Sequence, residues 1–194
     1  MNVPGNMDNQ ITYLPIIFYA AFLLFYRFAE SITMLKVGSM KRMPKFEWTM
    51  PLMMGSFILI FTAPVFEYLY YETKPSLSTY VPGGVLFILA ALIRSKGHLD
   101  LGKGFSMAVE RIEGQPLVET GLYRYIRHPL YLGTICLFFA CPVFLGAYRS
   151  LMMTALGLIA LFIRIRREEA FLVETMDGYS EYKKRTRAII PFLY

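Results

Sequence analysis

The sequence predicts an all-α, polytopic membrane protein with about five transmembrane helices. The chain of 194 residues is 56% hydrophobic, with a mean hydropathy of +0.44, whereas a soluble domain is roughly 45–50% apolar. The apolar residues also gather in blocks of about membrane-spanning length, which a soluble core does not need. Lipid is therefore the expected solvent for most of the chain.

Five apolar segments are expected to cross the bilayer. They cover about residues 11–28, 48–71, 80–94, 130–147 and 149–165. Only the second comfortably reaches the roughly 20 residues that a perpendicular span requires. The first is expected to remain a membrane helix, because MNVPGNMDNQ before it lacks the basic region of a cleaved signal peptide. Since the turn FLGAYRS is brief, the last two should form a tight antiparallel helical hairpin.

Two polar regions interrupt this pattern. Residues 95–127 contain five glycines and few apolar residues, and they are expected to form a long structured loop. Long polar loops in small membrane proteins often hold functional sites. After Arg164 the chain is strongly charged but keeps a helical period, which predicts a C-terminal surface helix.

The charge distribution predicts the orientation in the membrane. The formal net charge is +6, and the basic residues cluster beside the apolar segments. This pattern is typical of membrane orientation and does not indicate a nucleic-acid partner. The loops after the first and third segments and the tail are basic, whereas EYLYYETKPSLST after the second has two glutamates and one lysine. We expect the N-terminus outside, and the C-terminus and the polar loop in the cytoplasm.

The cysteine pattern indicates neither a disulfide framework nor a zinc site. Cys136 and Cys141 both lie within one apolar segment and are not at CxxC spacing. Free thiols packed in the interior are expected. No metal site is predicted.

Polar residues gather where the fourth helix is predicted to begin. Pro129 suits the first turn of a helix, because the N–H that it lacks would be unpaired there. The free amides of such a helix end attract anions. Arg124, Arg127 and His128 would reinforce this attraction.

The end of the fifth helix should lie opposite this helix start. Arg164 and Glu168 are four residues apart and share a helix face, and Glu169 follows. In an antiparallel hairpin these side chains and His128 would meet in one cytoplasm-facing pocket, which suits a zwitterion such as an amino-acid head group. The alternative is a solvated helix with ordinary ion pairs, with Arg127 and Tyr131 serving only as interfacial anchors.

The same residues carry a resemblance to a known family. Residues 117–133 (LVETGLYRYIRHPLYLG), 164–172 (RIRREEAFL) and 178–191 (GYSEYKKRTRAIIP) resemble the isoprenylcysteine carboxyl methyltransferase family. That family shares with the phospholipid methyltransferases an RHP-x-Y-x-G signature followed by EE-x-x-L. GHLDLGKGFS is similar to the family's preceding segment, through His98, Leu101, Gly102 and Ser106. Phe105 departs from the tryptophan that the family often has there.

The resemblance implies S-adenosylmethionine as cofactor and S-adenosylhomocysteine as product. A single membrane domain over 1–194 is expected, with three transmembrane helices in 1–94 from the apolar pattern. The resemblance covers roughly residues 95–191 and implies that 95–194 is the cofactor-binding and catalytic half. Arg164 and Glu168 would be the catalytic residues on the acceptor side. The cofactor-binding residues implied are Leu117, Val118, Gly121, Tyr123, Arg127, His128, Tyr131, Gly133, Glu168 and Glu169.

The resemblance leaves the methyl acceptor open. A lipid or prenylated acceptor entering sideways from the bilayer is expected, with carboxyl O-methylation first and phospholipid N-methylation second. For an ionised carboxylate Arg164 would orient the acceptor, whereas an amine would need Glu168 as a base. An NADPH-dependent sterol reductase-like protein is a further alternative, although such chains are longer and have more spans. A non-catalytic scaffold or transporter would bind neither cofactor.

Overall fold

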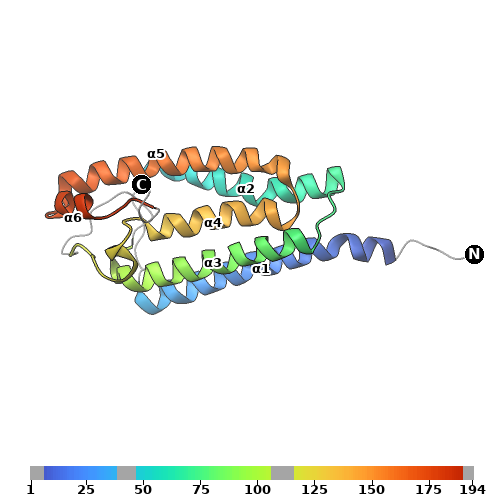
Figure 1. Cartoon of the computed structure of the whole chain (residues 1–194), viewed down its shortest axis with the longest axis horizontal. Helices are drawn as coiled ribbons and strands as arrows, with labels where there is room; N and C mark the ends of the chain where they lie inside the picture. Colours follow the sequence, from blue (N-terminus) through green and yellow to red (C-terminus); the bar gives the residue numbers. More distant parts are fainter. Residues whose placement is uncertain (1–6, 39–46, 106–115, 190–194) are drawn as a thin grey trace, which may run out of the picture.

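The computed structural model describes residues 7–38, 47–105 and 116–189. Over these residues the chain is all-α, as predicted, and has no strand. Figure 1 shows the long helices lying side by side along the molecule, with a short helix at one end. The helices are α1 (Met7–Val37), α2 (Thr49–Tyr71), α3 (Leu77–Leu101), α4 (Pro129–Phe144), α5 (Leu151–Thr175) and α6 (Tyr179–Arg185).

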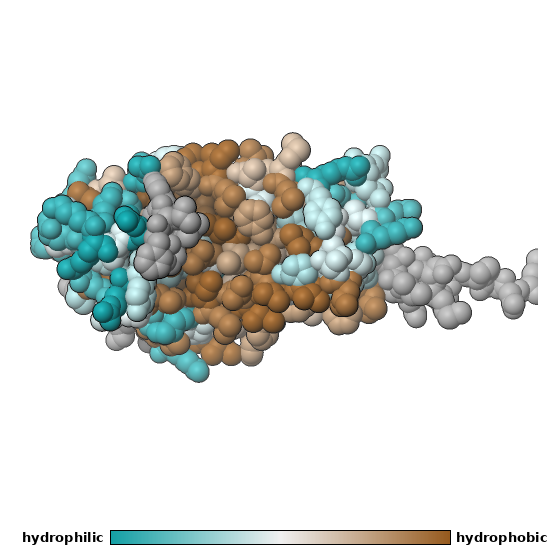
Figure 2. Space-filling view, viewed as in Figure 1, coloured by the Kyte–Doolittle hydropathy of each residue, from teal (hydrophilic) through white to brown (hydrophobic). Residues whose placement is uncertain are grey.

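The bundle has the dimensions and surface of an integral membrane protein. Among the described residues, four stretches are long and apolar enough to cross a membrane: Tyr13–Val37, Thr49–Tyr71, Leu77–Leu101 and Tyr148–Thr175. Helix α4 is also apolar but has only 16 residues. Figure 2 shows a hydrophobic band around the middle of the molecule between two hydrophilic ends. The prediction of about five membrane helices is confirmed as four long ones and one short one.

Three predicted helix boundaries were wrong. Helices α1, α3 and α5 continue well past the apolar segments 11–28, 80–94 and 149–165. The added turns carry charged residues that are paired inside the bundle, such as Glu30 with Arg94. Because these charges have partners on neighbouring helices, they do not end the helix. Residues 95–101 therefore belong to α3, and the predicted loop begins after Leu101; its residues 106–115, which include Ser106, lie outside the described residues.

The connection between α4 and α5 is as short as predicted, but these two helices are not each other's main partners. Helix α4 packs mainly against α3, and α5 packs mainly against α2. Figure 1 shows α4 lying beside α3 and α5 beside α2. Gly83 of α3 explains the first contact, because a Cβ there would lie 2.6 Å from the Cα of Phe144. Small residues allow such close backbone approach between membrane helices.

A carboxylate of α2 caps the start of α5. Glu67 is buried, and it accepts hydrogen bonds from the backbone N–H groups of Arg149 at 3.1 Å and Ser150 at 2.7 Å. The hydroxyl of Ser150 donates to the same carboxylate at 2.7 Å. Negative charge at a helix N-terminus is stabilising. This cap joins α2 to α5 at the end of the bundle opposite α6.

The chain after α6 returns to the start of α4. The backbone N–H of Arg127 donates to the carbonyl of Arg187 at 2.8 Å, and that of His128 donates to the carbonyl of Ala188 at 2.9 Å. A parallel bridge between Ile126 and Arg187 extends this pairing. The Arg127–His128–Pro129 segment (the RHP step) is thus held by a segment about 60 residues away in the sequence.

Candidate active site

A cavity of about 540 Å³ lies at the α6 end of the bundle. One part of it is lined by aromatic and charged side chains of α4, α5, α6 and the segment before α4. The other part is lined by apolar side chains of α2, among them Met53, Phe57 and Phe61, with Tyr26 and Met34 of α1. Since the α2 residues of the lining run from Met50 to Phe61, the lining follows this helix for roughly 16 Å along its axis. The cavity therefore joins a polar site to the interior of the membrane region.

Most of the predicted site residues meet in this cavity. Arg164 and Glu168 of α5 line it together with Tyr131 of α4 and with His128, which directly precedes α4. The sequence predicted that these residues would meet. The predicted cofactor-binding residues that line it are Leu117, Val118, Tyr123, Arg127, His128, Tyr131 and Glu168. Gly121, Gly133 and Glu169 are not among its lining residues.

Tyr131 connects the two candidate catalytic residues. Its hydroxyl donates to Oε2 of Glu168 at 2.6 Å and accepts from Nε of Arg164 at 2.9 Å. Arg164 also donates from Nη1 to Oγ1 of Thr49 at 2.7 Å and to Glu47 at 3.3 Å. Both candidate residues are therefore held by hydrogen bonds at the cavity wall. Tyr131 is an interior hydrogen-bonding residue here, which does not fit the alternative of an interfacial anchor.

Glu169 has a different environment from Glu168. It accepts from Nε of Arg127 at 2.7 Å and lies 2.9 Å from Nζ of Lys183 and 3.3 Å from Nε2 of His128. Arg127 also donates to the carbonyl of Thr186. This buried cluster clamps the RHP step between α5 and the C-terminal segment. Of the two adjacent carboxylates, Glu168 faces the cavity and Glu169 holds its wall together.

Three tyrosines form an aromatic part of the lining. The hydroxyl of Tyr182 donates to the carbonyl of Tyr123 at 2.6 Å. Burial raises the pKa of Tyr182 to about 12, and it also raises the pKa of Tyr123 and Tyr179. These phenols therefore stay neutral at physiological pH. Within the described part of the chain, the buried hydroxyl of Tyr179 has no hydrogen-bond partner.

Gly121 and Gly133 allow close packing of α3 against the signature segment. Gly121 has a φ of +62°, and a Cβ there would overlap the carboxylate of Asp100, which accepts from the backbone N–H of Leu122 at 2.9 Å. A Cβ at Gly133 would lie 2.5 Å from Cγ of Arg94. Both glycines thus let α3 approach the signature segment. Their predicted contact with the cofactor stays a prediction.

Three charged residues beside the site were not predicted as part of it. Glu30 and Arg94 line the cavity, and Glu47 pairs with Arg164. A carboxylate inside the apolar run of α1 was the available signal, because intramembrane charges are commonly functional. The partners of Glu30 and Glu47 lie 64 and 117 residues away, so the sequence offered no way to pair them.

The comparisons with known proteins find similarity in the segment that contains the two signature elements. Residues 84–174 match the model of the isoprenylcysteine carboxyl methyltransferase (ICMT) family. Over this segment the chain is similar to the ICMT family. The match contains the RHP-x-Y-x-G signature, the EE-x-x-L element and Arg94, but the part of α1 that carries Glu30 lies outside it.

Curated relatives of two named activities are similar to this chain. The Protein-S-isoprenylcysteine O-methyltransferase of Schizosaccharomyces pombe is 33% identical over 121 residues, which are 60% of this chain and 51% of that protein. The protein of the same name from Saccharomyces cerevisiae is 33% identical over 137 residues, 69% of this chain and 57% of that protein. Methanethiol S-methyltransferase 1 of Bradyrhizobium diazoefficiens is 39% identical over 72 residues, 37% of this chain and 25% of that protein.

The similarity is partial in length. The matched region covers about half of each of the two isoprenylcysteine relatives and a quarter of the methanethiol relative. The segment that matches the ICMT family model includes the cavity residues of α3, α4 and α5, whereas the cavity residues of α1, α2 and α6 lie outside it.

Proposed function

We propose that this chain is an integral-membrane methyltransferase that uses S-adenosylmethionine and methylates a lipidic acceptor, with the carboxylate of a prenylated cysteine as the first candidate. The observation that carries the proposal is the single cavity that joins Arg164 and Glu168 to an apolar part lined by Met53 and Phe57. A soluble acceptor would not need the apolar part. The names of the ICMT-family relatives support the same reading.

The residues of the polar part fit the proposed cofactor. A volume of about 540 Å³ falls in the range of roughly 300–1,000 Å³ typical of small-molecule sites. The hydroxyl of Tyr179, which has no hydrogen-bond partner among the described residues, would offer a polar contact to a ligand. Tyr123 and Leu117 would flank the adenosine part, and His128 and Glu168 would face the amino-acid part. When bound, S-adenosylmethionine supplies a methyl group on a positively charged sulfur.

The protein's own residues then orient the acceptor and exclude water. Arg164 offers a positive charge to an acceptor carboxylate, which is ionised at neutral pH and has no proton to lose. The apolar part of the cavity would hold the lipid chain and keep water from the reacting carboxylate. Alignment of the reacting groups is the main requirement of a direct displacement. No general base is needed for this acceptor.

A thiol is the second candidate acceptor. The methanethiol S-methyltransferase relative is similar to this chain over the shorter matched region. A thiol must lose a proton before attack, and Glu168 at the cavity wall would accept it. The comparisons support neither phospholipid N-methylation nor a reductase. The apolar part of the cavity favours the prenylated carboxylate over a small thiol.

One pair of measurements tests the function. Calorimetric titration of the detergent-solubilised protein should show binding of S-adenosylhomocysteine and no binding of NADPH. Incubation with radiolabelled methyl donor and a prenylated cysteine should label the acceptor in a form that mild base removes, as it does an ester. If the labelled product survives mild base, the methyl group is not on an ester. The acceptor would then be a thiol or an amine and not the carboxylate. A protein that binds only NADPH, or neither compound, would contradict it.

Replacement of Arg164 tests the acceptor side. Arg164→Ala should lower the turnover of the prenylated carboxylate by about 100-fold, because an unoriented acceptor loses most of the benefit of proximity. Arg166→Ala is the matched control, since Arg166 lies two residues away on the exposed face of α5. Turnover should be compared at saturating cofactor. Near-normal turnover in Arg164→Ala would exclude this role.

A further inference from the structure

A buried carboxylate of α1 lines the cavity together with His128 and Tyr131 of the signature. Glu30 is 2% exposed and lines the cavity, although it sits within a membrane-spanning stretch. An ionisable side chain at this depth is costly and is retained where it serves the function of the protein. The partners of Glu30 indicate what that function is.

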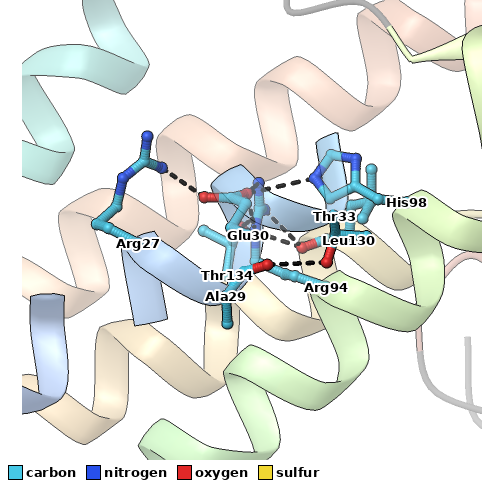
Figure 3. Close-up of polar contacts among 8 residues, drawn as sticks. All are labelled: Arg27, Ala29, Glu30, Thr33, Arg94, His98, Leu130 and Thr134. Carbon is cyan, nitrogen blue, oxygen red and sulfur yellow. Dashed lines mark hydrogen bonds and ion pairs between the residues drawn. The ribbon is translucent and has the colours of Figure 1, made fainter. Parts of the chain in front are cut away.

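Glu30 joins α1 to α3 through a buried ion pair. Its Oε1 accepts from Nε of Arg94 at 2.7 Å and also binds the Nη2 group of Arg94. Nε2 of His98 lies 3.3 Å from the same oxygen, and Oε2 accepts from Arg27. Figure 3 shows Glu30 between Arg27 on one side and Arg94 with His98 on the other. The carboxylate is therefore fully engaged with protein groups.

The remaining nitrogen of Arg94 reaches the first turns of α4. Nη1 donates to the carbonyl of Leu130 at 3.1 Å and to Oγ1 of Thr134 at 2.8 Å (Figure 3). Leu130 directly precedes Tyr131, the residue that connects Arg164 to Glu168. One guanidinium thus links the carboxylate of α1 to the helix turn that carries the site.

The packing of α3 against α4 depends on the same side chain. A Cβ at Gly133 would lie 2.5 Å from Cγ of Arg94 and 3.2 Å from the carbonyl oxygen of Ala90. The final glycine of the RHP-x-Y-x-G signature therefore makes room for Arg94. A buried ion pair is weak evidence for a stabilising role, because desolvation offsets the attraction. This ion pair differs from a merely structural one because Arg94 also contacts the turn of α4 that carries Tyr131.

We propose that Glu30 and Arg94 are positioning residues of the methyl-transfer site, an inference that rests on the function proposed above. Glu30 orients the guanidinium of Arg94, and Arg94 holds the turn that carries His128 and Tyr131. A displacement of about 1 Å at a reacting group can cost about 100-fold in rate. The N-terminal helix, outside the family-matched region, therefore contributes to catalysis through α3 and α4.

Two matched glutamate variants test the proposal. Glu30→Gln keeps the shape of the side chain and removes its charge. Glu67→Gln makes the same change in the buried carboxylate at the opposite end of the bundle. For each variant we would measure kcat, the acceptor KM, the affinity for S-adenosylhomocysteine by calorimetry, and the melting temperature in detergent.

Glu30→Gln should lower kcat by about 10-fold or more and change the acceptor KM by less than about 3-fold, because the loss lies in alignment and not in acceptor binding. The affinity for S-adenosylhomocysteine should fall by about 3-fold, since His128 and Tyr131 line its part of the cavity. Glu67→Gln should lower the melting temperature and leave kcat within about 2-fold of the wild type.

Normal kcat and normal S-adenosylhomocysteine affinity in folded Glu30→Gln would overturn the proposal. If that variant does not fold, Thr134→Val replaces it, because it removes one acceptor of Arg94 and keeps the side-chain shape. An unchanged kcat in Thr134→Val would equally overturn the proposal. A wild-type protein without methyl transfer or S-adenosylhomocysteine binding would contradict both the proposed function and the role of Glu30 and Arg94. If the wild type is active, the variants test the role of Glu30 and Arg94 alone.

Discussion

Tyr131 shows how single residues organise the candidate site. Its one hydroxyl both donates to Glu168 and accepts from Arg164, so two side chains of α5 are held by one side chain of α4. The sequence predicted that these residues would meet, because the RHP and EE elements end the same short hairpin. It did not predict the tyrosine bridge or the contribution of Glu47, since hydrogen-bond partners depend on the rotation of each helix about its axis.

Removal of the Tyr131 hydroxyl should reduce activity without unfolding the protein. A hydrogen bond to a charged group is worth about 1.5–3 kcal/mol, and about 1.4 kcal/mol corresponds to tenfold in rate. Tyr131→Phe should therefore lower kcat by roughly 10- to 100-fold. Tyr80→Phe, near the start of α3 and far from the cavity, is the control. Equal kcat values for the two variants would show that the bridge is not needed.

The helices follow the sequence pattern in number and order but not in length or partner. The apolar pattern and Pro129 predicted the start of α4 to within one residue. The predicted spans excluded the charged last turns of α1, α3 and α5. Local hydropathy counts each charged residue as unfavourable and carries no information on whether the charge has a partner on another helix. The main packing of α4 on α3 was also not predicted, since a short connection favours the neighbouring helix as partner.

Two glycines distinguish helix packing from helix propensity. A Cβ at Gly83 would lie 2.6 Å from the Cα of Phe144, whereas a Cβ at Gly55 would have no neighbour within 4 Å. Gly83→Ala should destabilise the protein by about 1–3 kcal/mol through overpacking. Gly55→Ala should be neutral or stabilising by up to about 1 kcal/mol, because alanine favours a helix interior.

Melting temperatures in detergent would measure both changes. The expected order is Gly55→Ala at or above the wild type and Gly83→Ala clearly below it. A Gly83→Ala variant that melts with the wild type would show that α3 and α4 can separate without cost. That result would contradict the close contact at Phe144.

At the scale of the whole molecule, the cavity and most of the charged side chains share one end of the bundle. Figure 2 shows hydrophilic surface at both ends, with the larger hydrophilic cap around α6. The basic residues of α6, among them Lys183 and Lys184, lie at this end. By the positive-inside rule we propose that the α6 end faces the cytoplasm and that the loop between α2 and α3 faces outside.

Site-directed labelling tests this orientation. In a background with Cys136 and Cys141 replaced by alanine, Lys74→Cys should react with a membrane-impermeant thiol reagent on intact bacterial host cells. Lys184→Cys should react only after the membrane is permeabilised. Both positions are exposed, so burial does not explain a difference. The reverse labelling pattern would place the candidate site on the outer face.

The sequence by itself determined that most of the chain is surrounded by lipid, that the fold is all-α, and which two motifs meet at the site. These properties follow from composition, local period and the spacing of residues along one hairpin, all of which are local. Only the tertiary structure decided where the charges of α1 and α2 go. Glu30 finds Arg94, and Glu47 finds Arg164, because packed helices bring distant residues within hydrogen-bond distance. A buried charge must be paired, but its partner is selected by the packing of the whole bundle.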